Sequence, residues 1–205
     1  MTERLPRLQP DELTDEQQFV YDAIAGGERA KGTQHFPLTA ADGTLNGPFG
    51  IMLHSPTVGA VLAELGSTLR FHTDLTSRCR EIAILQVAQG TGSEFEWWAH
   101  ALVAKAVGLT DEEVMTLSIG AFVSQDPTER AVAELCANLL TSSVVTDGEY
   151  ERAASVLSAE QIVDLTVLVG YYRTLAQLMT VFDVGIPDGE RPVVVDDGHH
   201  HHHSH

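Results

Sequence analysis

The sequence contains only two cysteines among its 205 residues, Cys79 and Cys136. They lie far apart and match no metal-ligand or redox spacing, so we expect two buried, unreactive thiols. Basic residues are also few: 12 Lys and Arg stand against 29 Asp and Glu, which gives a formal net charge of −17. This balance argues against nucleic-acid binding through a basic face. Because the acidic residues are spread along the chain, we interpret them as solvated surface.

Long apolar runs and secretory signals are lacking too, which predicts a cytoplasmic protein that does not engage a membrane. The end of the chain, from Gly198 through a run of histidines, has the composition of a purification tag. We therefore expect a single domain over residues 1–190, with an N-terminal extension, and a C-terminal arm with a probable tag over residues 191–205.

No segment alternates convincingly between apolar and polar residues, so no strand is expected. Apolar residues instead recur at helical spacing between capping residues and glycines. These patterns predict helices over residues 14–26, 55–70, 76–89, 93–108, 110–120, 126–142, 147–157 and 158–182. The fold class is therefore predicted as all-α, a bundle of about seven to eight helices whose sites lie between facing helices.

The longest segment without periodicity runs over residues 28–48 and is rich in glycine and proline. Its end, residues 45–53, is more apolar and is expected to tuck against the core. Long loops that return to a core often shape a pocket, and they also serve as plain packing segments. Both interpretations stay open from the sequence.

Residues 80–100 hold the internal cluster of carboxylates, imidazole and tryptophan. On a helix, Ser93, Glu96 and His100 share one stripe, and Glu96 and His100 are close enough to touch. A carboxylate beside an imidazole forms a proton-transfer pair in which each partner adjusts the pKa of the other. The alternative is an ordinary surface pair, worth only ~0.2–0.5 kcal/mol.

Glu81 is a carboxylate within an otherwise apolar helix that we expect to be central and buried. A buried carboxylate is costly unless it is paired. Glu81 is therefore expected either to pair with Arg80 or another cation, or to face a polar cavity.

Three segments of this region, residues 80–85, 94–100 and 106–113, together resemble the carboxymuconolactone decarboxylase family, which includes the alkylhydroperoxidase D-like proteins. The resemblance implies the alkylhydroperoxidase D-like helical bundle. The peroxidase-like branch of that family carries a Cys-x-x-Cys-x-x-x-His pattern, and this chain has Ser93 and Glu96 at the two cysteine positions. A dithiol cycle needs both thiols, so thiol peroxidase activity is not expected.

The decarboxylase branch carries Glu-x-x-x-His, which Glu96 and His100 satisfy. The resemblance implies cofactor-free removal of a carboxylate from a small lactone, or a related proton transfer beside a carbonyl. His100 would shuttle the proton, Glu96 would orient or acidify the imidazole of His100, and Glu81 would support the relay. For substrate binding, the resemblance and the spacing suggest Arg80, Ser93 and Trp97, with one of the two adjacent tryptophans lining the pocket and the other in the core or an interface.

Two function classes follow from these observations. The first is a carboxy-lyase-like enzyme that acts on a small molecule without a cofactor or a metal. The second is a non-catalytic, oligomeric small-molecule-binding protein, in which the cluster survives only as a buried polar network. The resemblance also implies a homo-oligomer, a trimer or a hexamer.

Overall fold

The computed structural model describes residues 4–27, 31 and 34–191. Within these residues the chain forms nine α-helices and one 3₁₀ turn, Pro10–Glu12, and has no strand beyond an isolated bridge between Thr39 and Leu45. The helices are α1 (Asp15–Ala25), α2 (Pro48–Met52), α3 (Pro56–Phe71), α4 (Ser77–Thr91), α5 (Glu94–Ala106), α6 (Asp111–Ser118), α7 (Pro127–Thr141), α8 (Asp147–Ala154) and α9 (Ala159–Phe182). The all-α prediction is confirmed.

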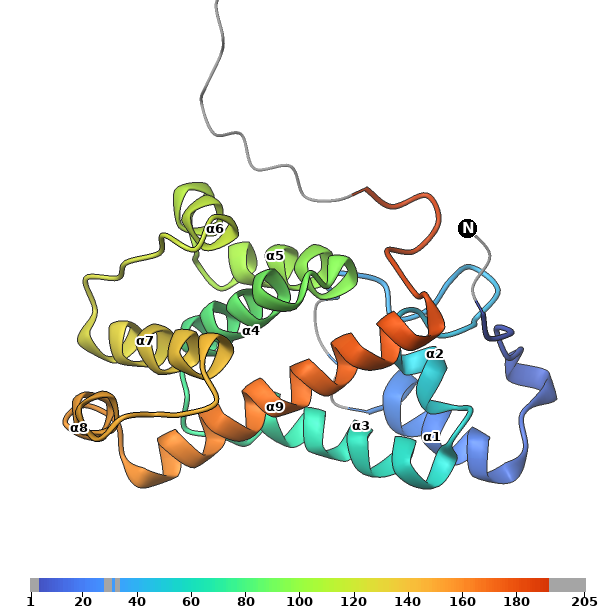
Figure 1. Cartoon of the computed structure of the whole chain (residues 1–205). Helices are drawn as coiled ribbons and strands as arrows, with labels where there is room; N and C mark the ends of the chain where they lie inside the picture. The colour runs from blue at the N-terminus through green and yellow to red at the C-terminus, as the bar shows by residue number, and fades with distance from the viewer. Residues whose placement is uncertain (1–3, 28–30, 32–33, 192–205) are drawn as a thin grey trace, which may run out of the picture.

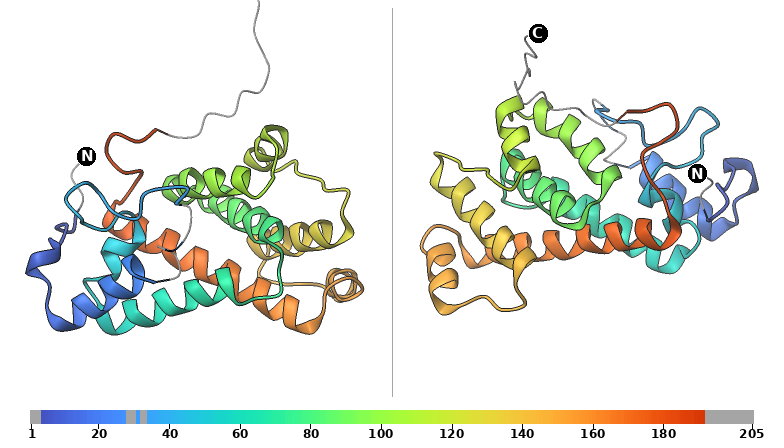
Figure 2. Two further views of the ribbon diagram at one scale, coloured as in Figure 1. Left: turned by 180° about the vertical axis from the view of Figure 1, so that it is seen from behind. Right: turned by 45° about the horizontal axis from the view of Figure 1, so that its top comes forward.

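The long helix α9 crosses the molecule and organises the others around it (Figure 1). Helices α7 and α8 lie beside its first turns, and α2 and α3 pack against it towards the other end, with α1 on the far side of α3. Helix α4 packs against α5, α7 and α9, so it is the central helix of the bundle (Figure 2). The prediction that this helix is enclosed on several sides is confirmed.

Local sequence signals set the helix ends. Thr14, Thr110, Thr146 and Ser158 each form a capping box, in which the side chain of the cap and that of the third helical residue satisfy each other's backbone N–H groups. Helix α4 ends at Gly92, which adopts a left-handed conformation (φ 68°). Ser93 then caps α5, so two long helices are joined by a turn of only two residues.

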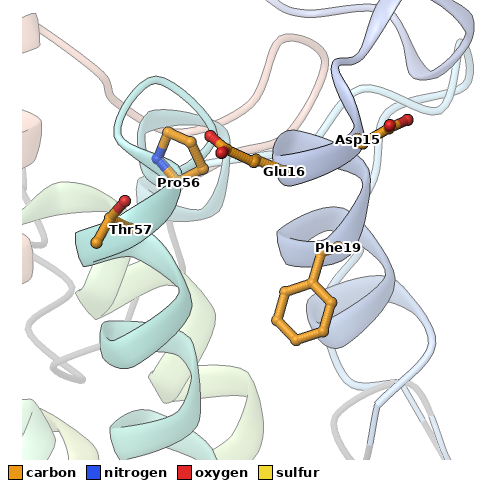
Figure 3. A pocket seen from close by; sticks show the side chains of 5 residues that line it. All are labelled: Asp15, Glu16, Phe19, Pro56 and Thr57. Atoms are coloured by element: carbon orange, nitrogen blue, oxygen red, sulfur yellow. The ribbon is translucent and has the colours of Figure 1, made fainter.

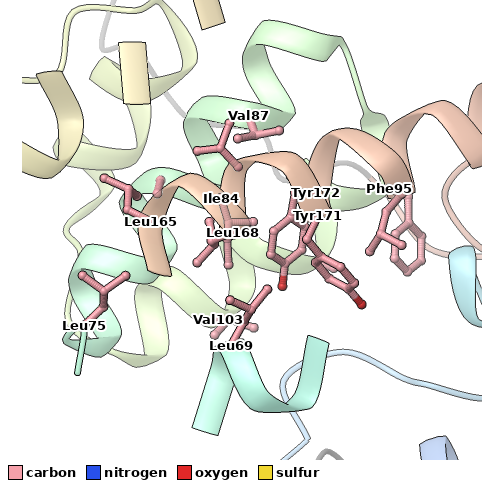
Figure 4. Close-up of a cluster of buried hydrophobic side chains, with 14 of the residues drawn as sticks. Leu69, Leu75, Ile84, Val87, Phe95, Val103, Leu165, Leu168, Tyr171 and Tyr172 are labelled. Carbon is pink, nitrogen blue, oxygen red and sulfur yellow. The ribbon is translucent and has the colours of Figure 1, made fainter. Parts of the chain in front are cut away.

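The core is a large apolar cluster that joins α9 to α3, α4 and α5. Figure 4 shows Leu165, Leu168, Tyr171 and Tyr172 of α9 with Ile84 and Val87 of α4 and Phe95 and Val103 of α5. A second, smaller cluster lies between α4, α5 and α6 and includes Ile82, Leu85 and Leu117. Both cysteines are buried, as predicted; burial raises the pKa of the Cys79 thiol and raises that of Cys136 to about 12.

The eight predicted helices all form, and their ends differ from the prediction by a few residues. The prediction was incomplete at α2, where residues 45–53 were expected only to tuck against the core. A helix of five residues is too short to show a 3.6-residue period. Its signal is Pro48 at the first helical position, after Gly47 in a conformation that favours glycine (φ 60°).

The boundary near residue 190 stays a prediction, because residues 192–205 lie outside the described part of the chain, together with the predicted arm and tag. In the described part, no single helix is long and apolar enough to cross a bilayer. Helices α8 and α9 meet that criterion only as a pair, and they are bent by 117° relative to each other.

An ion-pair network ties α4 to α6 and α7 at the side of the bundle. The guanidinium of Arg78 contacts Glu113 at 2.6 Å and Glu129 at 3.1 Å, and it donates to the Gly108 carbonyl at 2.7 Å. Glu129 is 8% exposed and also accepts a hydrogen bond from Ser124. The network raises the pKa of Arg78, because the charged form is bound by both carboxylates.

Replacing Arg78 with Met is expected to destabilise the fold by about 2–3 kcal/mol, because it leaves the buried Glu129 carboxylate without its cation. Urea unfolding measures this effect. The control is Arg152→Met, which removes an exposed pair with Glu134 and should cost less than about 1 kcal/mol. Equal effects of the two changes would show that the Arg78 network does not hold the helices together.

Candidate active site

The side chains predicted to carry chemistry meet between two consecutive helices. Glu81 comes from α4, and Glu96 and His100 come from α5, where they lie four residues apart on one face. Ser93 accepts a hydrogen bond from the Glu96 backbone N–H and so fixes the start of α5. The short turn at Gly92 brings the two helices together, so that a carboxylate 19 residues before His100 faces the imidazole.

Both nitrogens of the His100 ring contact a carboxylate. Nδ1 lies 2.7 Å from Oε2 of Glu81, and Nε2 lies 3.3 Å from Oε2 of Glu96. The three residues are buried, with exposed fractions of 3%, 3% and 5% for Glu81, Glu96 and His100. Glu81 therefore has the partner that its burial requires, and that partner is His100 rather than Arg80.

The charge state of this cluster follows from competing effects on His100. Burial disfavours the imidazolium and by itself would lower the pKa of His100, whereas the charge and hydrogen bond of Glu81, together with Glu96, favour it. The carboxylates win, and the pKa of His100 is raised to about 9. The raised pKa favours the protonated ring, in which Nδ1–H donates to Glu81 and Nε2 faces Glu96, so the arrangement suits His100 to act as a proton donor.

Aromatic rings enclose the imidazole. The Tyr172 ring of α9 meets it edge to face at 5.3 Å between centroids, and the Phe36 ring lies 6.2 Å away. Phe36 in turn contacts Phe95 at 6.2 Å and Trp98 at 5.8 Å. This apolar surround excludes water and strengthens the electrostatic interactions inside it.

Phe36 and Tyr172 were not predicted as site residues. Phe36 lies in the loop 28–48, for which the sequence left both a pocket-shaping and a packing role open. The signal that could have found it is that Phe36, beside Pro37, is the one aromatic residue of the segment 28–48. Tyr172 was predicted only as part of the apolar stripe of the last helix, because helical spacing does not reveal which neighbour a stripe residue meets.

Each of the three predicted substrate-binding residues has a structural contact of its own. The guanidinium of Arg80 donates to the Leu75 carbonyl at 2.6 Å and to Ser77 at 3.0 Å, at the start of α4. Burial lowers the pKa of Arg80. Trp97 packs against the smaller apolar cluster, whereas Trp98 is the tryptophan that contacts Phe36. Ser93 acts as a helix cap.

The described pockets lie outside this cluster. A groove of about 1050 Å³ is lined by the N-terminal arm, residues 37–46, Glu94 and residues 183–190. A smaller pocket of about 400 Å³ lies between α1 and α3, beside Phe19 and Pro56 (Figure 3). In the described residues no group of three or more His, Cys, Asp or Glu side chains is arranged to hold a metal ion.

The chain is thus an all-α bundle with a buried carboxylate–histidine cluster between two consecutive helices. Residues 56–137 match the model of the carboxymuconolactone decarboxylase family, and this segment contains Glu81, Glu96 and His100. This segment is therefore similar to the carboxymuconolactone decarboxylase family, and the fold of the chain is the one that alkylhydroperoxidase D-like structures share. A comparison with curated proteins finds no match.

Solved structures share the fold at low sequence identity. An uncharacterised peroxidase-related protein from Ralstonia eutropha JMP134, described as an alkylhydroperoxidase AhpD core, is 13% identical with a TM-score of 0.71, over 91% of this chain and 93% of that one. The debrominase Bmp8 in complex with 2,3,4-tribromopyrrole is 14% identical with a TM-score of 0.69, over 92% and 94%. The protein ATU0492 from Agrobacterium tumefaciens, a putative antioxidant defence protein AhpD, is 20% identical with a TM-score of 0.60, over 65% and 93%.

Proposed function

We propose that this protein is a cofactor-independent enzyme that moves a proton beside the carbonyl group of a small lactone or carbonyl acid, with decarboxylation as the overall reaction. The observation that supports this proposal is the buried imidazole of His100 with a carboxylate at each ring nitrogen. A proton donor fixed in a dry site, with a second group able to return its proton, is what general acid catalysis requires.

The two carboxylates have different contacts and therefore different proposed roles. Glu81 holds Nδ1–H at 2.7 Å, which fixes the orientation of the ring and stabilises the imidazolium. The Nε2 contact to Glu96 is longer, 3.3 Å, and is the one that a substrate carbonyl oxygen would replace. Glu81 is thus the positioning residue, His100 the acid, and Glu96 the group that exchanges protons with the ring.

In the proposed reaction, the bond between the carboxylate and the adjacent carbon breaks and carbon dioxide leaves. The electron pair moves onto the carbonyl oxygen as an enolate, which Nε2–H of His100 stabilises. The proton then passes from Nε2 to carbon, and the neutral ring is reprotonated through Glu96. One substrate carboxylate and one proton give one product and one carbon dioxide, so no oxidant or reductant is needed.

The proposal does not include thiol peroxidase chemistry. The positions that carry cysteines in the peroxidase-like branch are Ser93, a helix cap, and Glu96, a partner of His100. Cys79 and Cys136 are both buried with raised pKa values, so neither thiol is poised to form the reactive thiolate.

A second candidate function is small-molecule binding without turnover. One observation favours it: the guanidinium of Arg80 already donates hydrogen bonds to the Leu75 carbonyl and to Ser77, which leaves fewer of its N–H groups to hold a substrate carboxylate. For either function we propose a homo-oligomer, as the family resemblance implies.

Proton NMR in deuterated water tests the first proposal, with a panel of γ-lactone acids and β-keto acids. We expect product formation, or entry of deuterium at the carbon beside the carbonyl, and a loss of about 10²–10⁴-fold in the His100→Ala variant. The matched control is His54→Ala, since His54 lies outside the cluster and contacts the Pro6 carbonyl. Turnover that survives His100→Ala would refute the assignment, and binding without turnover would support the second function.

A further inference from the structure

The ring of Phe36 fills a space that is bounded by aromatic groups and by the imidazole of His100. Its centroid lies 5.8 Å from Trp98 and 6.2 Å from both Phe95 and His100. The rings of Phe36 and Phe95 are perpendicular, at 90°, and the side chain of Phe36 is only 8% exposed. These edge-to-face contacts are the arrangement that aromatic rings prefer.

Phe36 belongs to an irregular segment, residues 34–47, which we call the strap. The later part of the strap is tied down by hydrogen bonds. Arg7 donates to Thr44 at 2.8 Å and to Asn46 at 2.7 Å, and the Tyr21 hydroxyl donates to the Gly43 carbonyl at 2.7 Å. At the other end, Asn46 donates to the Pro37 carbonyl at 3.1 Å. Phe36 therefore lies at the edge of a firmly held turn and is itself placed by ring packing.

The groove of about 1050 Å³ is lined in part by the chain neighbours of this aromatic pair. Pro37 and Glu94 line the groove, and Phe36 and Phe95, the residues next to them in the chain, contact each other. The Phe36 ring also contacts the imidazole of His100. Displacing the Phe36 ring would leave a space the size of one ring beside the imidazole.

We propose that the position of the Phe36 ring is the binding subsite for a planar, unsaturated ring of the ligand, and that Phe36 is a displaceable cover which decides what enters. This inference rests on the proposed function for its choice of His100 as the reacting group. The surround favours a planar unsaturated ring because such a ring can repeat the edge-to-face contacts that Phe36 makes with Phe95 and Trp98, whereas a saturated ring cannot. It also offers a π-face to a cationic imidazole.

Binding of phenol and of cyclohexanol, measured by titration calorimetry, tests the proposal without any need for turnover. Phe36→Ala should bind phenol about tenfold more tightly than the unmodified chain, because the competing occupant is gone. It should also prefer phenol to cyclohexanol by about fivefold, since only phenol restores the aromatic contacts. The control is Phe19→Ala, an exposed phenylalanine of α1 beside the other pocket, which should bind both probes as the unmodified chain does.

Phe36→Val is the second variant, because it keeps more of the packing; it should bind phenol with an affinity between those of the unmodified chain and Phe36→Ala. Circular dichroism establishes that each variant is folded. A folded variant that binds phenol no better than the unmodified chain, or that binds both probes equally, overturns the subsite. If the variant binds phenol but the protein turns over no lactone, the ring subsite is supported and the proposed reaction is refuted. Failure of the subsite and failure of the proposed reaction are therefore distinguishable.

Discussion

Raising the pH from 6 to 10 is expected to lower the free energy of unfolding of the unmodified protein by on the order of 3 kcal/mol more than that of a His100→Gln variant. The pKa of His100 is raised from 6.5 to about 9 by folding. The folded state therefore binds a proton more tightly than the unfolded state does. The resulting stability is fully present below pH 6.5 and is lost as the pH rises through 9.

Urea unfolding at intervals between pH 6 and 10 measures this difference. The comparison with His100→Gln is needed because the buried thiols also favour unfolding in alkaline solution, since their pKa values are raised in the folded state. That contribution is common to both proteins and is removed by subtraction. Parallel curves for the two proteins would mean that the ring of His100 is neutral in the fold, and the proposed acid role would fail with it.

Replacing Gly47 with Ala is expected to destabilise the fold by more than about 3 kcal/mol. Gly47 has φ 60° and ψ −138°, a backbone conformation that residues with a Cβ atom rarely adopt. A Cβ atom at this position would also collide with the Phe95 ring. Backbone strain and collision act together here. Because Phe95 supports Phe36 and Trp98, the change should also disturb the aromatic surround of His100.

The matched control is Gly92→Ala. Gly92 also has a positive φ, 68°, but a Cβ atom there would have no neighbour within 4 Å. Its cost should be about 1 kcal/mol, the strain of a left-handed conformation alone. Thermal unfolding gives the two stabilities, and near-ultraviolet circular dichroism reports the aromatic packing. Equal costs would contradict the close approach of Gly47 to Phe95.

The sequence was sufficient for every described helix except α2, because the signals of those helices are local. Capping residues such as Thr110 and Ser158 act within one turn, and the apolar spacing of α9 repeats over 24 residues. The same reasoning placed Glu96 and His100 on one face of α5. It also showed that Glu81 needs a partner, but burial alone left open whether that partner was Arg80, and only the packing of α4 on α5 assigns it to His100.

The enclosure of the site could not be predicted in the same way, because it depends on contacts between distant segments. Phe36 reaches His100 from a loop without periodicity, and Tyr172 reaches it from α9. Spacing also could not separate the adjacent tryptophans. Their roles follow from which neighbour each face of α5 meets: Trp98 turns to Phe36, and Trp97 to the smaller cluster with α4 and α6.

The turn of two residues between α4 and α5 has a consequence for how this protein can change. All three ionisable groups lie within 20 consecutive residues, from Glu81 to His100, so the reaction centre is inherited as one short block of sequence. The Phe36 strap comes from a separate block that ends before α2 begins. Substitutions in the strap can therefore alter which molecules reach the imidazole without changing Glu81, Glu96 or His100.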